Sequence, residues 1–301
     1  MELPWFIKIR IIGVIAAGFL LIGVWAWPIA SPIEPAGPVS FLLGNITLGG
    51  TIALLVLAFC SGFVAYFLSW PYGRQIAVLA VPSGLAVWAV RTASVGSIIQ
   101  QYPSADYRQS LFSALKWEPV FWLAVVFAGF AGVWAAGKIS SGKFDADKQN
   151  EENPSKSTIY VNALIALVGS VLLAQLCLKL FAQDVKLPDS RLGVIMAQPV
   201  VGQIVFAVLL SFGIAAFLVE KFLNAGYLWS VIATGLVAAF VGVGSTRPEV
   251  LQYLSQNVPA NCFPNAILAI MPVQMVAFGT LGSIAGYWMA IRYDYWRQNE
   301  S

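Results

Sequence analysis

Long apolar runs alternate with short polar segments along the chain, and one polar stretch divides these runs into two sets. Residues 138–157 read KISSGKFDADKQNEENPSKS, in which four lysines alternate with four acidic residues. A segment of this composition cannot bury enough apolar surface to fold by itself. The pattern therefore predicts a solvated linker at this point of the chain.

Four apolar segments precede the linker and four follow it. A helix needs about 20 mostly apolar residues to cross the hydrocarbon core of a bilayer. The segments that meet this requirement are residues 11–30, 46–70, 76–99, 120–137, 158–181, 199–222, 227–244 and 266–291. The pattern predicts an all-α integral membrane protein with about eight transmembrane helices.

The second set of segments echoes the first in order. At an offset of 151 residues, Gly62 corresponds to Gly213 and Gly84 to Gly235, and after a short adjustment Gly132 corresponds to Gly286. Each set has an even number of helices, so both copies would share one orientation about a pseudo-two-fold axis along the membrane normal. The predicted organisation is a first four-helix repeat, a cytoplasmic linker and a second four-helix repeat with a short tail, over residues 1–137, 138–157 and 158–301.

The charges on either side of the predicted helices indicate the orientation. Eight spans place both termini on one side, together with ten Lys and Arg residues, against seven on the other. An excess of basic residues marks the cytoplasmic side. The N- and C-termini are therefore predicted to be cytoplasmic, and the four linker lysines decide this balance.

Each repeat also has a polar segment on the outer side, between its third and fourth spans. In the first repeat, Tyr107, Leu111 and Leu115 would share one face of an amphipathic helix over residues 103–117. In the second, the Thr246–Glu249 spacing is that of a capping box and predicts a helix over residues 247–256. These helices would lie on the membrane surface or line a vestibule.

Composition restricts the chemistry. The chain is 59% hydrophobic and 10% charged, with mean hydropathy +0.78, which is far from the composition of soluble domains. The net charge of +3 is dispersed and predicts no nucleic-acid partner. There is no histidine, and the three cysteines, Cys60, Cys177 and Cys262, lack metal-ligand spacing. We expect the lipid bilayer as surroundings and no metal or cofactor.

An enzymatic function is not expected either. The carboxylates predicted on the outer side form no evident nucleophile–base pair; they are Glu34, Asp106, Glu118, Asp184, Asp189 and Glu249. A lipid-modifying enzyme therefore ranks last among the functions considered. No catalytic residue is predicted.

Candidate binding residues come from the middle of the third and seventh spans. Ser83 and Gly84 follow Pro82, and Thr234 and Gly235 take the corresponding position in the second copy. Helix breaks at matching positions of two repeats are typical of transport sites. Small residues also permit close helix packing, and a hydroxyl often bonds to its own helix. Both interpretations stay open.

Other polar residues lie within the predicted spans. Arg91, toward the outer end of the third span, would anchor the helix to lipid phosphates or bind an anionic ligand. The predicted spans also contain amide side chains that are expected to form hydrogen bonds between helices, at Asn162, Gln175, Gln203 and Gln274.

Two functions from different classes fit this pattern. The first, narrowly favoured, is a permease or channel-like transporter of a small neutral or amphipathic solute, with Ser83, Gly84, Thr234, Gly235 and Arg91 as ligand-binding residues. The second is a non-catalytic structural or scaffold subunit of a larger membrane complex. Either would work as a homo-oligomer or with membrane-protein partners.

Overall fold

The protein is described by a computed structural model in which each predicted span overlaps a helix, although the helix of the third span ends at Arg91 and that of the eighth begins at Pro272. The structure describes residues 4–32, 37–42, 46–92, 95, 98, 105–140, 156–183, 185–189, 193–197, 199–245 and 266–300. The helices of the first half are α1 (Trp5–Gly18), α2 (Trp27–Ala30), α3 (Leu48–Leu68), α4 (Gly73–Ile76), α5 (Ala80–Arg91), α7 (Ala105–Leu115) and α8 (Glu118–Ser140). Those of the second half are α9 (Lys156–Phe181), α10 (Val201–Leu223), α11 (Leu228–Ser245) and α13 (Pro272–Glu300).

Six helical segments in this part of the chain are long and apolar enough to cross a membrane. They are Trp5–Trp25, Leu48–Leu68, Gly73–Arg91, Gln109–Ser140, Tyr160–Phe181 and Val201–Leu223. The chain is therefore a multi-pass integral membrane protein. The predicted number was eight, and the two remaining predicted spans correspond to α11, which is apolar but short, and α13, which is long but less apolar.

The lower hydropathy of α13 has two sources, its polar and exposed C-terminal end and the enclosed position of its first residues. Its residues 272–280 are all buried, because α13 packs against α5, α8, α10 and α11. A helix enclosed by other helices need not present a hydrophobic surface to lipid. Gln274 and Thr280 are tolerated there for this reason.

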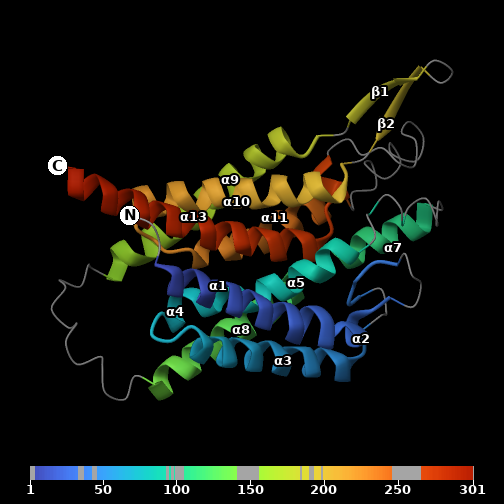
Figure 1. Ribbon diagram of the computed structural model, residues 1–301. Helices are drawn as coiled ribbons and strands as arrows, with labels where there is room; N and C mark the ends of the chain where they lie inside the picture. Colours follow the sequence, from blue (N-terminus) through green and yellow to red (C-terminus); the bar gives the residue numbers. More distant parts are fainter. Residues whose placement is uncertain are drawn as a thin grey trace.

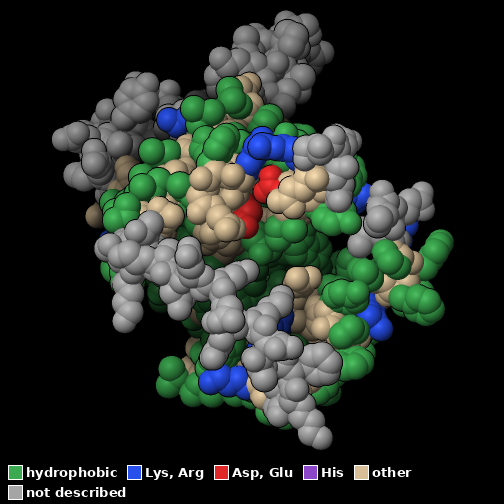
Figure 2. All heavy atoms as spheres, turned by 90° about the vertical axis from the view of Figure 1, so that its left-hand side faces the viewer, with side chains coloured by type: hydrophobic (Ala, Val, Ile, Leu, Met, Phe, Trp, Pro, Cys, Tyr) green, Lys and Arg blue, Asp and Glu red, His purple; other side chains and the backbone are tan. Residues whose placement is uncertain are grey.

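The helices of the first half lie together on one side of the molecule and those of the second half on the other (Figure 1). The two termini lie at one end, and α7 and a β-hairpin lie at the opposite end (Figure 1). Lys and Arg side chains are spread over the end that holds the termini, with a few acidic side chains near its centre (Figure 2). The two ends of the chain therefore lie together at one end of the helix bundle.

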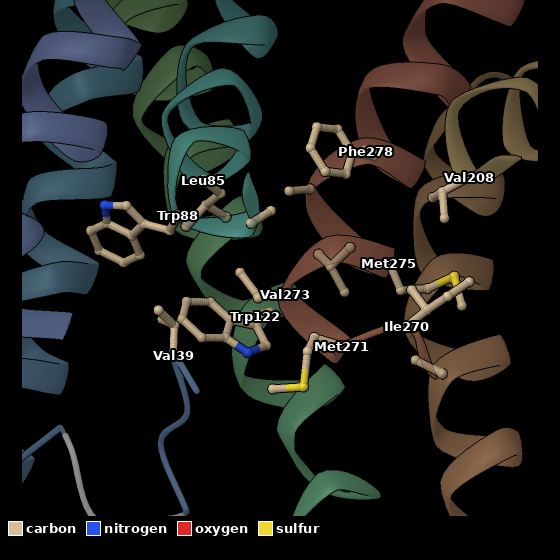
Figure 3. Packing of buried hydrophobic residues seen from close by; sticks show 14 of the residues in the cluster. Val39, Leu85, Trp88, Trp122, Val208, Ile270, Met271, Val273, Met275 and Phe278 are labelled. Atoms are coloured by element: carbon tan, nitrogen blue, oxygen red, sulfur yellow. The ribbon is translucent and has the colours of Figure 1, made fainter. Parts of the chain in front are cut away.

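Pairs of helices pack in the same pattern within each half. In the first half α3 packs on α8 and α1 on α5; in the second α10 packs on α13 and α9 on α11. Between the halves, α5 packs on α13 and α11 on α8. One apolar core runs across both halves, and Figure 3 shows Leu85 from α5, Trp122 from α8 and Val273 from α13 within it.

Glycines bring the paired helices into backbone contact. A Cβ atom on Gly62 of α3 would lie 2.0 Å from the carbonyl oxygen of Gly129 in α8. A Cβ on Gly286 of α13 would lie 2.0 Å from the carbonyl oxygen of Gly213 in α10. Close packing of small residues is a main source of helix association in lipid, where burying apolar surface between helices gains little.

Outside the membrane segments, the structure adds one element that the sequence analysis did not predict. Strands β1 (Val185–Asp189) and β2 (Gly193–Ala197) form an antiparallel hairpin between α9 and α10. The predicted amphipathic helix of the first half is confirmed as α7, with Leu111 and Leu115 buried. The predicted helix over 247–256 lies outside the described residues, as do linker residues 141–155.

Candidate functional site

Ser83 and Gly84 lie in α5 where this helix meets α1. The Ser83 hydroxyl donates to the carbonyl oxygen of Ala80 at 2.8 Å, one turn back in its own helix, and lies 3.5 Å from the carbonyl oxygen of Ile15 in α1. A Cβ on Gly84 would lie 2.5 Å from the carbonyl oxygen of Gly18. The pair thus lets α5 and α1 approach closely.

Thr234 and Gly235 lie in α11 and contact α13 and α8. The Thr234 hydroxyl donates to the carbonyl oxygen of Val231 at 2.7 Å, and its methyl group lies against Gly279 of α13. A Cβ on Gly235 would lie 2.2 Å from a methyl carbon of Leu123 in α8. Both predicted hydroxyls therefore already have an acceptor on their own helix, and the two pairs contact different helices.

Arg91 is the last residue of α5 and is exposed. Its guanidinium carbon lies 5.0 Å from the centre of the Trp27 ring, which packs edge-on against Trp88 at 6.3 Å. This cation–π contact holds the side chain at the end of the helix that faces away from the termini. Its position suits an anchor at lipid phosphates.

Glu118 is the first residue of α8, and its burial was not expected from the sequence. The sequence analysis counted it with the outer carboxylates, but its side chain is fully buried. It accepts hydrogen bonds from the Ser40 hydroxyl, from the backbone N–H of Phe41 (2.8 Å) and Leu42 (3.3 Å), and from the Trp122 indole (3.3 Å). The carboxylate fastens the loop of residues 37–42 onto the start of α8.

Aromatic residues enclose this carboxylate. Trp122 packs edge-on against Trp88 of α5 at 6.2 Å and against Phe41 of the loop at 5.0 Å. The backbone N–H of Val39 in the same loop donates to the Thr92 hydroxyl at 3.0 Å. Figure 3 shows Val39 beside Trp122, so the loop closes the end of the bundle. Local sequence carries no signal for this arrangement, because the loop and Glu118 are far apart in the chain.

Amide side chains connect separate elements, as the sequence analysis predicts. The Gln274 side chain of α13 donates to the carbonyl oxygen of Ala89 in α5 at 3.0 Å and accepts from the Met271 N–H at 3.0 Å. The prediction of an interhelical bond is confirmed for Gln274, which joins the two halves. It is also confirmed for Gln203 of α10, whose side chain donates to the carbonyl oxygen of Phe181, the last residue of α9, at 3.3 Å, and to that of Gln183 at 2.9 Å.

Two further features of the membrane interior are unusual. The first span continues from α1 into a π-helical segment, Phe19–Trp25, which packs on α5, and α5 itself is preceded by a 3₁₀ turn, Ala77–Leu79. Irregular helix segments of this kind often mark functional sites. In addition, four buried hydroxyls lack a hydrogen-bond partner among the described residues: Ser61, Ser211, Thr280 and Ser283.

A groove runs between α10 and α13. Its volume is about 430 Å³, and apart from glycine its lining side chains are apolar. The lining residues are Phe206, Leu209, Leu210, Gly213, Ile214, Phe217 and Leu218 of α10 and Gly282, Ala285, Gly286 and Met289 of α13. None of the residues proposed from the sequence lines this groove.

Comparisons with known proteins identify no relative. No protein-family model, curated protein or solved structure matches the chain. Within the described part of the chain, no three Cys, Asp or Glu residues gather closely enough to hold a metal ion. The functional argument therefore depends on the packing of the helices and on the surface they present.

Proposed function

We propose that this protein is a non-catalytic structural subunit of a larger membrane complex, built from two tandem four-helix repeats. The observation that carries this proposal is the use made of the mid-membrane polar and small residues. Ser83 and Thr234 bond to their own helices, while Gly84 and Gly235 contact neighbouring helices directly. These residues serve helix packing, which is what a scaffold requires of them.

The packing between the halves supports the duplication. A two-fold exchange of the halves turns α5 into α11 and α13 into α8. The contact of α5 with α13 then becomes the contact of α11 with α8, and both contacts occur. The proposed unit boundaries are residues 1–137 and 158–301, joined by the linker over 138–157.

The outer face of α9 offers a surface for a partner. Its exposed apolar side chains recur at intervals of three or four residues: Val161, Leu164, Val168, Leu172, Leu176 and Leu180. A continuous stripe of this kind presents one face to lipid or to a helix of another subunit. The partners of a scaffold would be membrane proteins or a second copy of this chain.

The test is the mass and composition of the protein extracted in a mild detergent from its native membrane. A stable particle that contains other membrane proteins in fixed ratio supports the scaffold. Substitution of Leu172 by Trp should release such a partner, whereas Phe240→Trp, on the exposed part of α11, serves as the matched control. A monomer that transports a solute when reconstituted alone would contradict the proposal.

A permease or channel for a small neutral or amphipathic solute is the second candidate. The π-helical segment beside α5 and the buried hydroxyls without partners favour it, because water or a polar solute would satisfy these groups. In that case Ser83→Ala and Thr234→Val should each weaken solute binding by about 1 kcal/mol, the net value of one hydrogen bond. Unchanged uptake in both stable variants would show that Ser83 and Thr234 do not form the solute site.

A further inference from the structure

The groove between α10 and α13 continues into a basic end. Its lining positions on α10 end at Phe217 and Leu218, and the next residue of the same helical stripe is Lys221. On α13 the stripe ends at Met289 and continues into Arg292. Both cations lie at the end of the molecule that holds the termini, just beyond the apolar groove.

Lys221 contacts aromatic rings of both helices, at the end of the bundle that also holds the carboxylates of Glu220 and Asp294. Its ammonium lies 4.4 Å from the centre of the Tyr293 ring, 5.9 Å from that of Phe217 and 5.7 Å from that of Phe222. Aromatic rings attract an ammonium ion without cancelling its net charge. The rings therefore hold a positive charge at the mouth of an apolar groove.

The dimensions of the groove fit a single acyl chain. From Phe206 to Leu218 it extends for about 18 Å at 1.5 Å per residue, compared with about 15 Å for half of a bilayer core. The volume of about 430 Å³ over that length gives a cross-section of about 24 Å².

We propose that this groove binds an anionic phospholipid, with one acyl chain between α10 and α13 and the headgroup at Lys221 and Arg292. Basic residues beside apolar grooves between transmembrane helices are suited to lipid phosphates. The glycines on both helices form the floor of the groove, because they bring the two backbones together without side chains in between. This inference goes beyond the proposed scaffold function and does not depend on it.

The first half of the chain differs at the corresponding positions. At the offset of 151 residues, Leu210 corresponds to Phe59, Ile214 to Phe63, and Leu218 to Phe67. The rings of these three phenylalanines pack along α3, with centroids 6.5 Å apart for the first pair and 5.3 Å for the second. Larger side chains at the α10 positions should therefore fill the groove.

The experiment measures thermal unfolding of the full chain, purified in detergent and depleted of lipid. Dioleoyl phosphatidylglycerol and dioleoyl phosphatidylcholine, which share their acyl chains, are titrated separately. The parent protein should reach half of its stabilisation at a phosphatidylglycerol concentration at least fivefold lower than for phosphatidylcholine. Lys221→Gln should lose about fivefold in apparent affinity for phosphatidylglycerol alone, the effect of one basic residue near a membrane surface.

A substitution that fills the groove tests the binding of the acyl chain separately from the binding of the headgroup. Ile214→Phe should weaken the response to both lipids, and lipid adducts counted by native mass spectrometry give the same answer if the variant is less stable. Two matched controls should behave as the parent. They are Lys179→Gln, near the C-terminal end of α9, and Val168→Phe, on the exposed face of α9. Equal responses to the two lipids in parent and Lys221→Gln would refute the proposal. So would a change of oligomeric mass in Ile214→Phe with lipid binding intact, since a protein helix would then cover the groove.

Discussion

Replacing Glu118 by Ala should destabilise the fold more than any other single polar substitution proposed for this chain. Glu118 is fully buried, and its two oxygens accept from the Ser40 hydroxyl, two backbone N–H groups and the Trp122 indole. Alanine removes the acceptor of all four bonds in a site closed by aromatic rings.

The magnitude follows from the number of donors. Each buried donor left without an acceptor costs about 1–3 kcal/mol, although the loop can move and recover part of that loss in water. A total of about 3–5 kcal/mol is expected for Glu118→Ala. Glu118→Gln keeps one carbonyl oxygen for the N–H groups of Phe41 and Leu42 but turns an amide N–H₂ toward the Trp122 indole, so we expect a loss of about 1–2 kcal/mol.

The assay is unfolding in mixed micelles, followed by the fluorescence of the chain's 11 tryptophans, one of which, Trp122, lies in the site itself. Ser40→Ala is the control: it removes one donor together with its need for an acceptor and should cost less than about 1 kcal/mol. The loss of stability should be largest for Glu118→Ala, intermediate for Glu118→Gln and smallest for Ser40→Ala. If Glu118→Ala unfolds at the same denaturant concentration as the parent, the carboxylate does not hold the loop and the reasoning is wrong.

Three further predictions concern topology and packing. A cysteine at Gln149→Cys in the linker should be protected from impermeant thiol reagents in intact cells, while Cys262 should react; the opposite labelling would invert the proposed cytoplasmic orientation. Gly286→Leu should cost about 3 kcal/mol or more because its Cβ would overlap the facing backbone, whereas Gly202→Leu, whose Cβ would have nothing within 4 Å, should unfold like the parent. Gln274→Leu should cost about 0.6–1.7 kcal/mol, measured by the same unfolding assay, since it removes the bond between the halves; no loss would mean that this bond does not contribute.

Much of the architecture could be read from the sequence because the bilayer makes each helix a local unit. A spanning segment must satisfy its own backbone hydrogen bonds, so length and hydropathy alone place it. This explains why every predicted span overlaps a helix and why the amphipathic pattern around Leu111 and Leu115 predicts α7 correctly. The tandem repeat was also proposed from sequence, from the spacing of glycines.

Hydropathy does not distinguish the residues inside the helix bundle from those on its lipid-facing surface. Residues that face lipid are as apolar as residues in the core, so no periodic pattern showed that α13 is enclosed while α9 is exposed. Nor could sequence choose between packing and binding at Ser83 and Thr234, because a hydroxyl beside a glycine suits both. That each hydroxyl donates to a carbonyl oxygen of its own helix is visible only in the structure.

Tertiary structure alone decided the arrangements that join distant parts of the chain. Glu118 resembled an exposed outer carboxylate until the loop of residues 37–42 folded over it, and the groove exists only because Gly213 and Gly286 bring α10 and α13 together. The physical reason is the same in both cases. A local sequence pattern reflects whether one helix is suited to lipid or to water. Its burial and the shape of its surface depend on which other helix packs against it.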